Sequence, residues 1–185
     1  MNIRKYILHV LMVIMIAPCM SSCLGDDDNS YDFTAWKNEN ESYFTRMEDT
    51  IGSDGKKVFE KITPVWAPEV SILAQWHNDR SLTASNLVPM DNSTCDVVYD
   101  CYYVNGVRLD ASWVLHADSI YSCKPTDNIV GFWTMLTNMH VGDSVTCVIP
   151  MNAAYGASSS SVRPYSTLIY HMKLKAISAY EISGK

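Results

Sequence analysis

The sequence predicts an α+β domain in which a twisted antiparallel β-sheet wraps around one short α-helix, preceded by an N-terminal helical extension. Apolar residues alternate with polar ones at 93–104, 144–149 and 167–177, which is the period of a strand with one buried face. Residues 128–139 repeat instead at helical spacing. A single short helix among antiparallel strands favours this fold class over a parallel α/β fold.

Residues 1–22 are predicted to be a lipoprotein signal peptide rather than part of the fold. Arg4 and Lys5 precede an apolar run of about a dozen residues, whereas a membrane-spanning helix needs about 20. The run ends in Met-Ser-Ser-Cys, which resembles the bacterial lipobox, so we expect lipidation at Cys23. An uncleaved membrane anchor is the alternative interpretation.

Residues 23–33 are expected to form an acidic tether. Three consecutive aspartates at 26–28 are most simply a solvated spacer. Such a run also resembles the signal that carries some Gram-negative lipoproteins to the outer surface. We therefore expect an exported outer-membrane lipoprotein, either on the periplasmic face or on the cell surface.

The composition fits one acidic domain. The chain has 185 residues with 14 Lys and Arg against 20 Asp and Glu, and it shows no basic patch, so nucleic acid is not an expected partner. The five histidines show no paired metal spacing, and the cysteine spacings do not resemble a zinc site. We expect no metal and no cofactor.

Four cysteines lie in the body of the chain: Cys95, Cys101, Cys123 and Cys147. The first two are six residues apart in one predicted strand, which separates them by about 20 Å, whereas a disulfide needs Cα atoms within about 7 Å. Any bridge would therefore involve Cys123 or Cys147. Alternatively, all four are small buried hydrophobic residues.

Residues 34–67 are expected to form a helix and a connector. The helix, from Thr34 to Ile51, has Thr34 as a plausible N-cap and Gly52 as a plausible stop. Its apolar face comprises Trp36, Tyr43, Phe44, Met47 and Ile51. Residues 62–69 read as a proline-marked connector. The helix most simply packs on the domain, and a dimerisation arm or a partner-binding helix is the alternative.

The strand at 93–104 should lead into a hairpin. Asn-Gly at 105–106 is a strong hairpin signal, and residues 107–110 should begin the return strand. The buried face of the first strand comprises Cys95, Val97, Tyr99, Cys101 and Tyr103.

The short helix is expected at residues 128–139, with Asp127 available as its N-cap. Its apolar side comprises Ile129, Phe132, Leu136 and Met139. The final strand, 167–177, should bury Leu168, Tyr170, Met172 and Leu174.

These elements and their residues resemble the FKBP family of peptidyl-prolyl cis-trans isomerases over about residues 70–177. The matching motifs are Val-Val-Tyr-Asp-Cys at 97–101, Asn-Gly at 105–106, Leu109-Asp110, Ile-Val-Gly-Phe at 129–132, Met-His-Val-Gly at 139–142, Pro150 with Ala-Tyr-Gly at 154–156, and Pro-Tyr-Ser-Thr-Leu-Ile-Tyr at 164–170. Seven such motifs in the correct order make a chance resemblance improbable. The resemblance implies an FKBP-like domain at 68–178, followed by a C-terminal tail at 179–185.

The resemblance also implies the activity. Rotation about a prolyl peptide bond is opposed by a barrier of roughly 18–20 kcal/mol, and a dry apolar pocket favours the less polar twisted state. We expect an isomerase that acts non-covalently on Xaa-Pro bonds of exported proteins and contacts the membrane through its lipid. The alternatives are a non-catalytic FKBP-like binding module or chaperone at the outer membrane, or a subunit of a larger assembly. A dimer through helix 34–51 is possible.

The resemblance assigns residues to this chemistry. The expected catalytic residues are Tyr155, which would donate its hydroxyl to the substrate carbonyl, with Asp110 and Tyr99. The expected substrate-binding residues are Leu109, Tyr121, Ile129, Phe132, Val162 and Tyr170, with Phe132 under the proline ring and the Ile129 N–H as a second donor. The chain departs from the family pattern with leucine at 109, phenylalanine at 132, cysteine at 101, serine at 119 and a short loop at 158–164.

Overall fold

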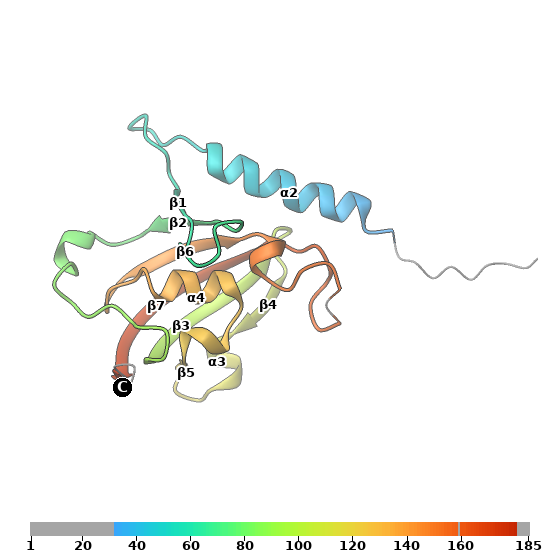
Figure 1. Ribbon diagram of the computed structural model, residues 1–185. Helices are drawn as coiled ribbons and strands as arrows, with labels where there is room; N and C mark the ends of the chain where they lie inside the picture. The colour runs from blue at the N-terminus through green and yellow to red at the C-terminus, as the bar shows by residue number, and fades with distance from the viewer. Residues whose placement is uncertain (1–31, 159, 181–185) are drawn as a thin grey trace, which may run out of the picture. The chain divides into compact units, whose positions relative to one another are not determined.

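A seven-stranded antiparallel sheet dominates the fold in the computed structural model, which describes residues 32–158 and 160–180 (Figure 1). The strand order is β1-β2-β6-β7-β3-β4, and β5 pairs with β3. The strands are β1 (Glu60–Ile62), β2 (Ile72–Trp76), β3 (Thr94–Tyr103), β4 (Arg108–Ala111), β5 (Tyr121–Cys123), β6 (Ser144–Ile149) and β7 (Leu168–Ala179). The described helices are α2 (Thr34–Asp49), α3 (Ser112–Leu115) and α4 (Val130–Leu136), with 3-10 turns η1 (Arg80–Leu82), η2 (Pro125–Asp127) and η3 (Met151–Ala153). The predicted α+β class is confirmed.

The three long central strands form where the sequence alternates. Every second residue of β3, from Cys95 to Cys101, is buried, and β7 buries alternate residues from Leu168 to Leu174. Side chains of a strand point alternately to its two faces, so these residues cover one side of the sheet. The predicted strands at 93–104, 144–149 and 167–177 are confirmed to within two residues at each end.

The hairpin between β3 and β4 turns at the predicted Asn-Gly pair. Gly106 has a φ of 81°, a left-handed conformation that glycine adopts without steric cost. Its N–H bonds to the Tyr103 carbonyl at 2.9 Å, and the Asn105 side chain accepts the Val107 N–H at 3.1 Å. The turn therefore sets the register that brings β4 beside β3.

Helix α4 packs its apolar side against the sheet and is shorter than predicted (Figure 1). Asp127 is not its N-cap; that position belongs to Ile129, while Asp127 ends the 3-10 turn η2. The backbone is extended at Asn128 (ψ 172°) and Ile129 (ψ 151°), which separates the turn from the helix. Gly131 lets α4 approach β6 closely, because a Cβ built there would overlap the Ile149 side chain.

The outward side of α4 carries a tryptophan pair. Trp133 stacks on Trp66 from the connector, with ring centroids 3.9 Å apart, and its indole N–H donates to Asp91 at 2.7 Å. The connector between β1 and β2 is thereby held against the helix.

Helix α2 packs through its first two turns against the segment that leads into β7. The Trp36 indole donates to the Ser166 hydroxyl at 3.2 Å, and the Asn40 side chain accepts the Thr167 N–H at 2.6 Å. Both helix residues are buried. The predicted apolar face is less buried than expected: Ile51 lies beyond the helix and is 54% exposed.

Helix α2 begins at Thr34 as predicted, but its predicted caps and its C-terminal end were wrong. The N-cap position is Phe33, because the Lys37 N–H bonds to its carbonyl at 2.8 Å, one residue before Thr34. The helix stops at Asp49, where Thr50 turns extended, rather than at Gly52. Ile51 instead forms a β-bridge with Lys57.

A buried carboxylate fastens the loop after β2 to the turn before β6. Asp143 has a fully buried side chain and accepts from Thr83 Oγ1 at 2.6 Å, Asn78 Nδ2 at 2.9 Å and the His140 N–H at 2.9 Å. The Arg80 guanidinium adds a charged bond at 3.2 Å. Four donors thus converge on one side chain, which replaces the water that the carboxylate loses on burial.

Residues 1–31, 159 and 181–185 lie outside the part of the chain that the structure describes. The predicted signal peptide, the lipidation site Cys23, most of the tether 23–33 and most of the tail 179–185 fall there and remain predictions. Within the described residues, none of the helices is long and apolar enough to cross a membrane.

Candidate functional site

A pocket of about 300 Å³ opens between the sheet and the start of α4. It is lined by residues from β3, β4, β5, η2, α4, β7 and the segments beside α4 and η3: Tyr99, Asp110, Tyr121, Asp127, Asn128, Ile129, Phe132, Tyr155 and Tyr170. Seven of the nine predicted site residues are therefore brought together from distant parts of the sequence.

The inner wall of the pocket is aromatic. The Phe132 ring lies edge-on to Tyr170, with centroids 5.3 Å apart, and to Tyr99 at 5.8 Å. Tyr121 adds an edge contact to Tyr99 at 5.5 Å. Edge-to-face arrangements at these separations are the favoured geometry of aromatic pairs. The rings thus form a preorganised apolar surface on which another flat or cyclic apolar group can rest.

Tyr99 and Asp110 form a hydrogen-bonded pair at one side of the pocket. The Tyr99 hydroxyl donates to Asp110 Oδ2 at 2.6 Å, while the Ala111 N–H donates to Oδ1 at 2.7 Å. Burial, followed by the bond to Asp110, raises the pKa of Tyr99 far above its ordinary value. Tyr99 therefore stays a neutral donor and keeps the carboxylate oriented.

The register of β3 and β4 positions this pair. Cys101 lies opposite Asp110, and a bulge follows between Cys101 and Tyr102. A bulge bends its strand and redirects the side chains around it. Asp110 and Tyr99 consequently reach the same end of the pocket from neighbouring strands.

A second polar pair closes the side beside α4. The Tyr121 hydroxyl donates to Asn128 Oδ1 at 3.2 Å, and Asn128 Nδ2 donates to the Lys124 carbonyl at 2.8 Å. Burial raises the pKa of Tyr121, so this hydroxyl also remains protonated. Asn128 is therefore held by its own turn while it fixes the tyrosine.

Sequence reasoning missed Asp127 and Asn128 as lining residues. Their position in the sequence could have identified them, because they directly precede the Ile-Val-Gly-Phe motif at 129–132. Because Asp127 ends a 3-10 turn rather than capping α4, both residues are placed at the pocket.

Tyr155 stands at the rim. It is 43% exposed and comes directly before Gly156, whose φ of 74° turns the chain away. Burial of part of the side chain raises the pKa of Tyr155, so its hydroxyl is a donor at neutral pH. Among the described residues, no acceptor bonds to the Ile129 N–H, and this residue lines the same pocket.

Two predicted substrate-binding residues do not line the pocket. Val162 is buried in the hydrophobic core, and Leu109 is partly buried against the same core. The predicted lipidation site, Cys23, lies outside the described residues.

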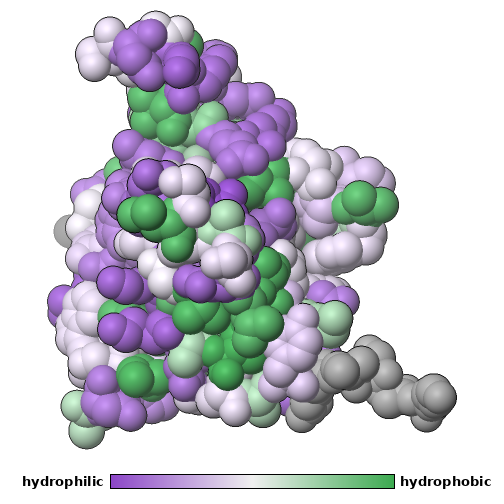
Figure 2. Space-filling model, turned by 90° about the vertical axis from the view of Figure 1, so that its left-hand side faces the viewer, coloured by the Kyte–Doolittle hydropathy of each residue, from purple (hydrophilic) through white to green (hydrophobic). Residues whose placement is uncertain are grey.

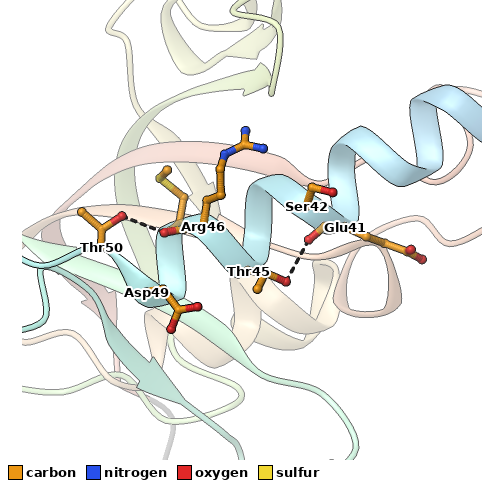
Figure 3. Close-up of a pocket in the computed structure, with 7 residues that line it drawn as sticks. Glu41, Ser42, Thr45, Arg46, Asp49 and Thr50 are labelled. Carbon is orange, nitrogen blue, oxygen red and sulfur yellow. Dashed lines mark hydrogen bonds between the residues drawn. The ribbon is translucent and has the colours of Figure 1, made fainter.

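Another hollow runs along the outer face of α2 but contains none of the predicted site residues (Figure 3). Its threonines bond within the helix: Thr45 donates to the Glu41 carbonyl at 3.2 Å and Thr50 to the Arg46 carbonyl at 2.8 Å. This surface is a solvated helix face. The pocket beside α4 is therefore the candidate site.

The arrangement suits non-covalent chemistry. Aromatic rings line the inner part, and the tyrosine hydroxyls with raised pKa values donate hydrogen bonds rather than act as nucleophiles. The pocket can hold an apolar ring inside and a carbonyl oxygen at its rim.

Comparison with known proteins shows which family one part of the chain matches. Residues 86–175, a little under half of the chain, match the model of the family described as FKBP-type peptidyl-prolyl cis-trans isomerase. No curated protein matches in sequence. The match agrees with the predicted enzyme class and confirms an FKBP-type domain in this chain.

Two solved structures share the fold. A peptidyl-prolyl cis-trans isomerase from Pseudomonas syringae is 19% identical with a TM-score of 0.60, over 79% of this chain and 96% of that one. FkpA from Escherichia coli is also 19% identical with a TM-score of 0.59, over 98% of this chain and 84% of that one.

Proposed function

We propose that this chain, in which residues 86–175 form an FKBP-type peptidyl-prolyl cis-trans isomerase domain, isomerises Xaa-Pro bonds of exported proteins. One observation carries the proposal: the pocket brings an aromatic inner wall, built around Phe132, together with two hydrogen-bond donors at its rim. No covalent intermediate is needed, since the reaction is a rotation about a bond of partial double-bond character.

In the proposed mechanism the proline ring rests on Phe132. Surrounded by aromatic rings, the prolyl amide loses part of its hydration, which favours the twisted state in which resonance is lost. The twisted carbonyl accepts hydrogen bonds from the Tyr155 hydroxyl and the Ile129 N–H. Asp110, which accepts a hydrogen bond from the Tyr99 hydroxyl at 2.6 Å, provides a carboxylate beside the bound amide.

Removal of the Tyr155 hydroxyl tests this mechanism. We expect Tyr155→Phe in the full chain to lower kcat/KM for an Xaa-Pro peptide about 3- to 10-fold, because one hydrogen bond is lost from the transition state. Asp110→Ala should cost about 10- to 100-fold, because it leaves the buried Tyr99 hydroxyl without its acceptor. NMR exchange spectroscopy on the peptide measures these rates without a coupling protease.

Tyr180→Phe is the matched control, since this tyrosine is 40% exposed and does not line the pocket. Its rate should equal that of the wild type. A wild-type rate no faster than the uncatalysed exchange would overturn the activity, and an unchanged Tyr155→Phe rate would overturn the role of the hydroxyl.

We further propose that the domain is an outer-membrane lipoprotein, on the periplasmic face or the cell surface. The support is the Met-Ser-Ser-Cys sequence after an apolar run at 7–17 and the acidic residues that follow it. Cys23→Ala should abolish incorporation of radiolabelled palmitate and move the protein out of the membrane fraction. Unchanged labelling would contradict this anchor.

Sedimentation of the extracted wild type would show whether α2 pairs two copies, as its half-buried Tyr43 and Met47 suggest.

A binding module or chaperone without catalysis is the second candidate. Large apolar side chains that do not line the pocket are exposed on the surface, including Val65 at 97% and Leu82 at 78%. Figure 2 shows separate hydrophobic areas among hydrophilic ones on one side of the molecule. In this case, suppression of client aggregation would persist in Tyr155→Phe while peptide exchange stayed at the uncatalysed rate.

A further inference from the structure

Four buried cysteines take no part in the proposed mechanism. Cys95, Cys101, Cys123 and Cys147 are all free thiols in the sheet. The sequence leaves their pairing open, apart from excluding a bond between the first two. The strand register now decides which of them can meet.

One pair lies directly opposite across two strands. Cys95 of β3 is the register partner of Cys123 of β5. Facing residues of an antiparallel pair have Cα atoms about 4.5–5.5 Å apart, and a disulfide forms at about 4.4–6.8 Å. Backbone separation therefore permits a bond between these two residues.

Both side chains point to the same side of the sheet. Cys95 is fully buried and Cys123 is 7% exposed. The next pair along the same register, Asp96 with Ser122, faces the opposite side, where the Ser122 hydroxyl donates to Asp96 Oδ1 at 2.6 Å. This bond fixes the register, so Cys95 and Cys123 lie opposite each other on the buried side of the sheet.

The remaining combinations are excluded by the sheet. Cys101 and Cys147 both lie opposite Tyr170, one on each side of β7. With β7 between them, their Cα atoms are roughly 10 Å apart, beyond the limit of a disulfide. β3 and β7 both lie between Cys123 and Cys147, and Cys101 is six residues along β3 from Cys95.

The Cys123 end of the pair is held by fewer strand pairings than the Cys95 end. β5 is three residues long, and in the described part of the chain it pairs with β3 alone. A small movement of such a strand can bring the sulfur atoms to bonding distance. The same strand carries Tyr121 in the pocket wall, so a covalent link at Cys123 would also hold Tyr121 in place.

We propose that Cys95 and Cys123 are a disulfide-forming site that locks β5 onto β3. The oxidant is an external disulfide, either of a small thiol or of an oxidoreductase, which an exported chain would meet. The Cys123 thiolate attacks one sulfur of that disulfide, and the other sulfur of the oxidant leaves as a thiolate. The Cys95 thiolate then attacks the Cys123 sulfur of the mixed disulfide, and the remaining sulfur of the oxidant leaves as a thiolate. Two protons and two electrons leave the protein thiols, and the oxidant becomes two thiols.

The reaction takes place during folding or when β5 opens, because burial in the folded core keeps both thiols protonated. Burial raises the pKa of Cys95 to about 12 and that of Cys123 to about 11. The thiolate, not the thiol, is the nucleophile. Oxidation should consequently be slow on the folded protein and fast during refolding.

The test is to refold the full chain in glutathione disulfide, with a sample in reduced glutathione beside it. Both samples are then denatured in the presence of iodoacetamide, which labels free thiols. They are digested, and the labelled cysteines are mapped by mass spectrometry. We expect Cys95 and Cys123 to lose the label in the oxidised sample while Cys101 and Cys147 stay labelled. The oxidised protein should also melt about 6–12 °C higher, because the bond closes a loop in the unfolded chain.

Cys123→Ala provides the control and should restore the label on Cys95 in the oxidised sample. The proposal is overturned if all four cysteines are labelled after oxidation, or if Cys95 stays unlabelled in Cys123→Ala. The mapping of the wild type needs no variant to fold, and its result does not depend on isomerase activity. A melting temperature unchanged by oxidation would overturn the locking of β5.

Discussion

Replacing Asp143 with alanine should lower the free energy of unfolding by about 3–5 kcal/mol, the cost of breaking a buried charge pair by removing one partner. The carboxylate is fully buried, and Arg80, Thr83 and Asn78 all donate to it. Removing it leaves these donors without their acceptor in a closed space. Urea titration followed by circular dichroism measures the loss.

Asp79→Ala is the matched control, because this carboxylate lies in the same loop but is exposed to solvent. Its loss of stability should be clearly smaller. A double-mutant cycle of Asp143→Ala with Arg80→Ala isolates the charged pair. If Asp143→Ala unfolds at the wild-type urea concentration, the loop does not depend on this carboxylate.

The same residue makes stability depend on pH. Burial acts to raise the pKa of Asp143, but hydrogen bonds from Thr83, the His140 N–H and Asn78, together with the Arg80 charge, outweigh burial and hold the pKa below its ordinary value. The stabilisation is therefore fully present above the pKa of the unfolded chain and is lost as the pH falls through the lower folded value. Asp143→Asn should show a flatter profile between pH 5 and 2 than the wild type, as urea midpoints would reveal.

A side chain at Gly131 should disrupt both stability and activity. A Cβ at this position would lie 3.0 Å from Cδ1 and Cγ1 of Ile149 and still closer to its Cγ2, and Ile149 is fully buried, so it has little room to move. We expect Gly131→Val to lose about 3 kcal/mol through overpacking. Since Phe132 follows directly, its ring should shift, and a displacement of about 1 Å can cost 100-fold in rate.

Shortening Ile149 provides the compensating change. Gly131→Val combined with Ile149→Ala should recover much of the exchange rate that the single variant loses, because space opens where the valine needs it. Ile149→Ala alone gives the cost of the cavity. A double variant no more active than Gly131→Val would show that the helix position does not depend on this contact.

The parts of the fold that follow a simple period were predictable. β3, β6 and β7 alternate visibly in the sequence, and their bounds were right to within two residues. β2 was missed because Ile72, Leu73 and Ala74 are all buried, and a strand covered on both faces loses its alternation. α2 was placed correctly, but its buried face depends on Asn40, which bonds to a backbone 127 residues away. No local pattern reports such a contact.

The site divides in the same way. Motif order identified Tyr99, Asp110, Phe132 and Tyr155, which do line one pocket, although their roles remain predictions. Asp127 was misassigned because a capping residue and the end of a 3-10 turn look alike in sequence. Their backbone angles decide between the two, and the sequence alone does not give those angles; in the structure the turn starts at the buried Pro125.

The tryptophan stack on the outward side of α4 gives the molecule an internal spectroscopic reporter. Trp133 neighbours Phe132 in sequence, yet its ring lies 3.9 Å from Trp66 and the pocket lining contains only tyrosine and phenylalanine rings. Two indoles this close couple their electronic transitions, so the near-ultraviolet circular dichroism depends on their mutual angle. A ligand that fills the pocket without moving α4 leaves this signal unchanged, whereas one that tilts the helix alters it. Near-ultraviolet circular dichroism can therefore distinguish a ligand that only fills the pocket from one that also moves α4.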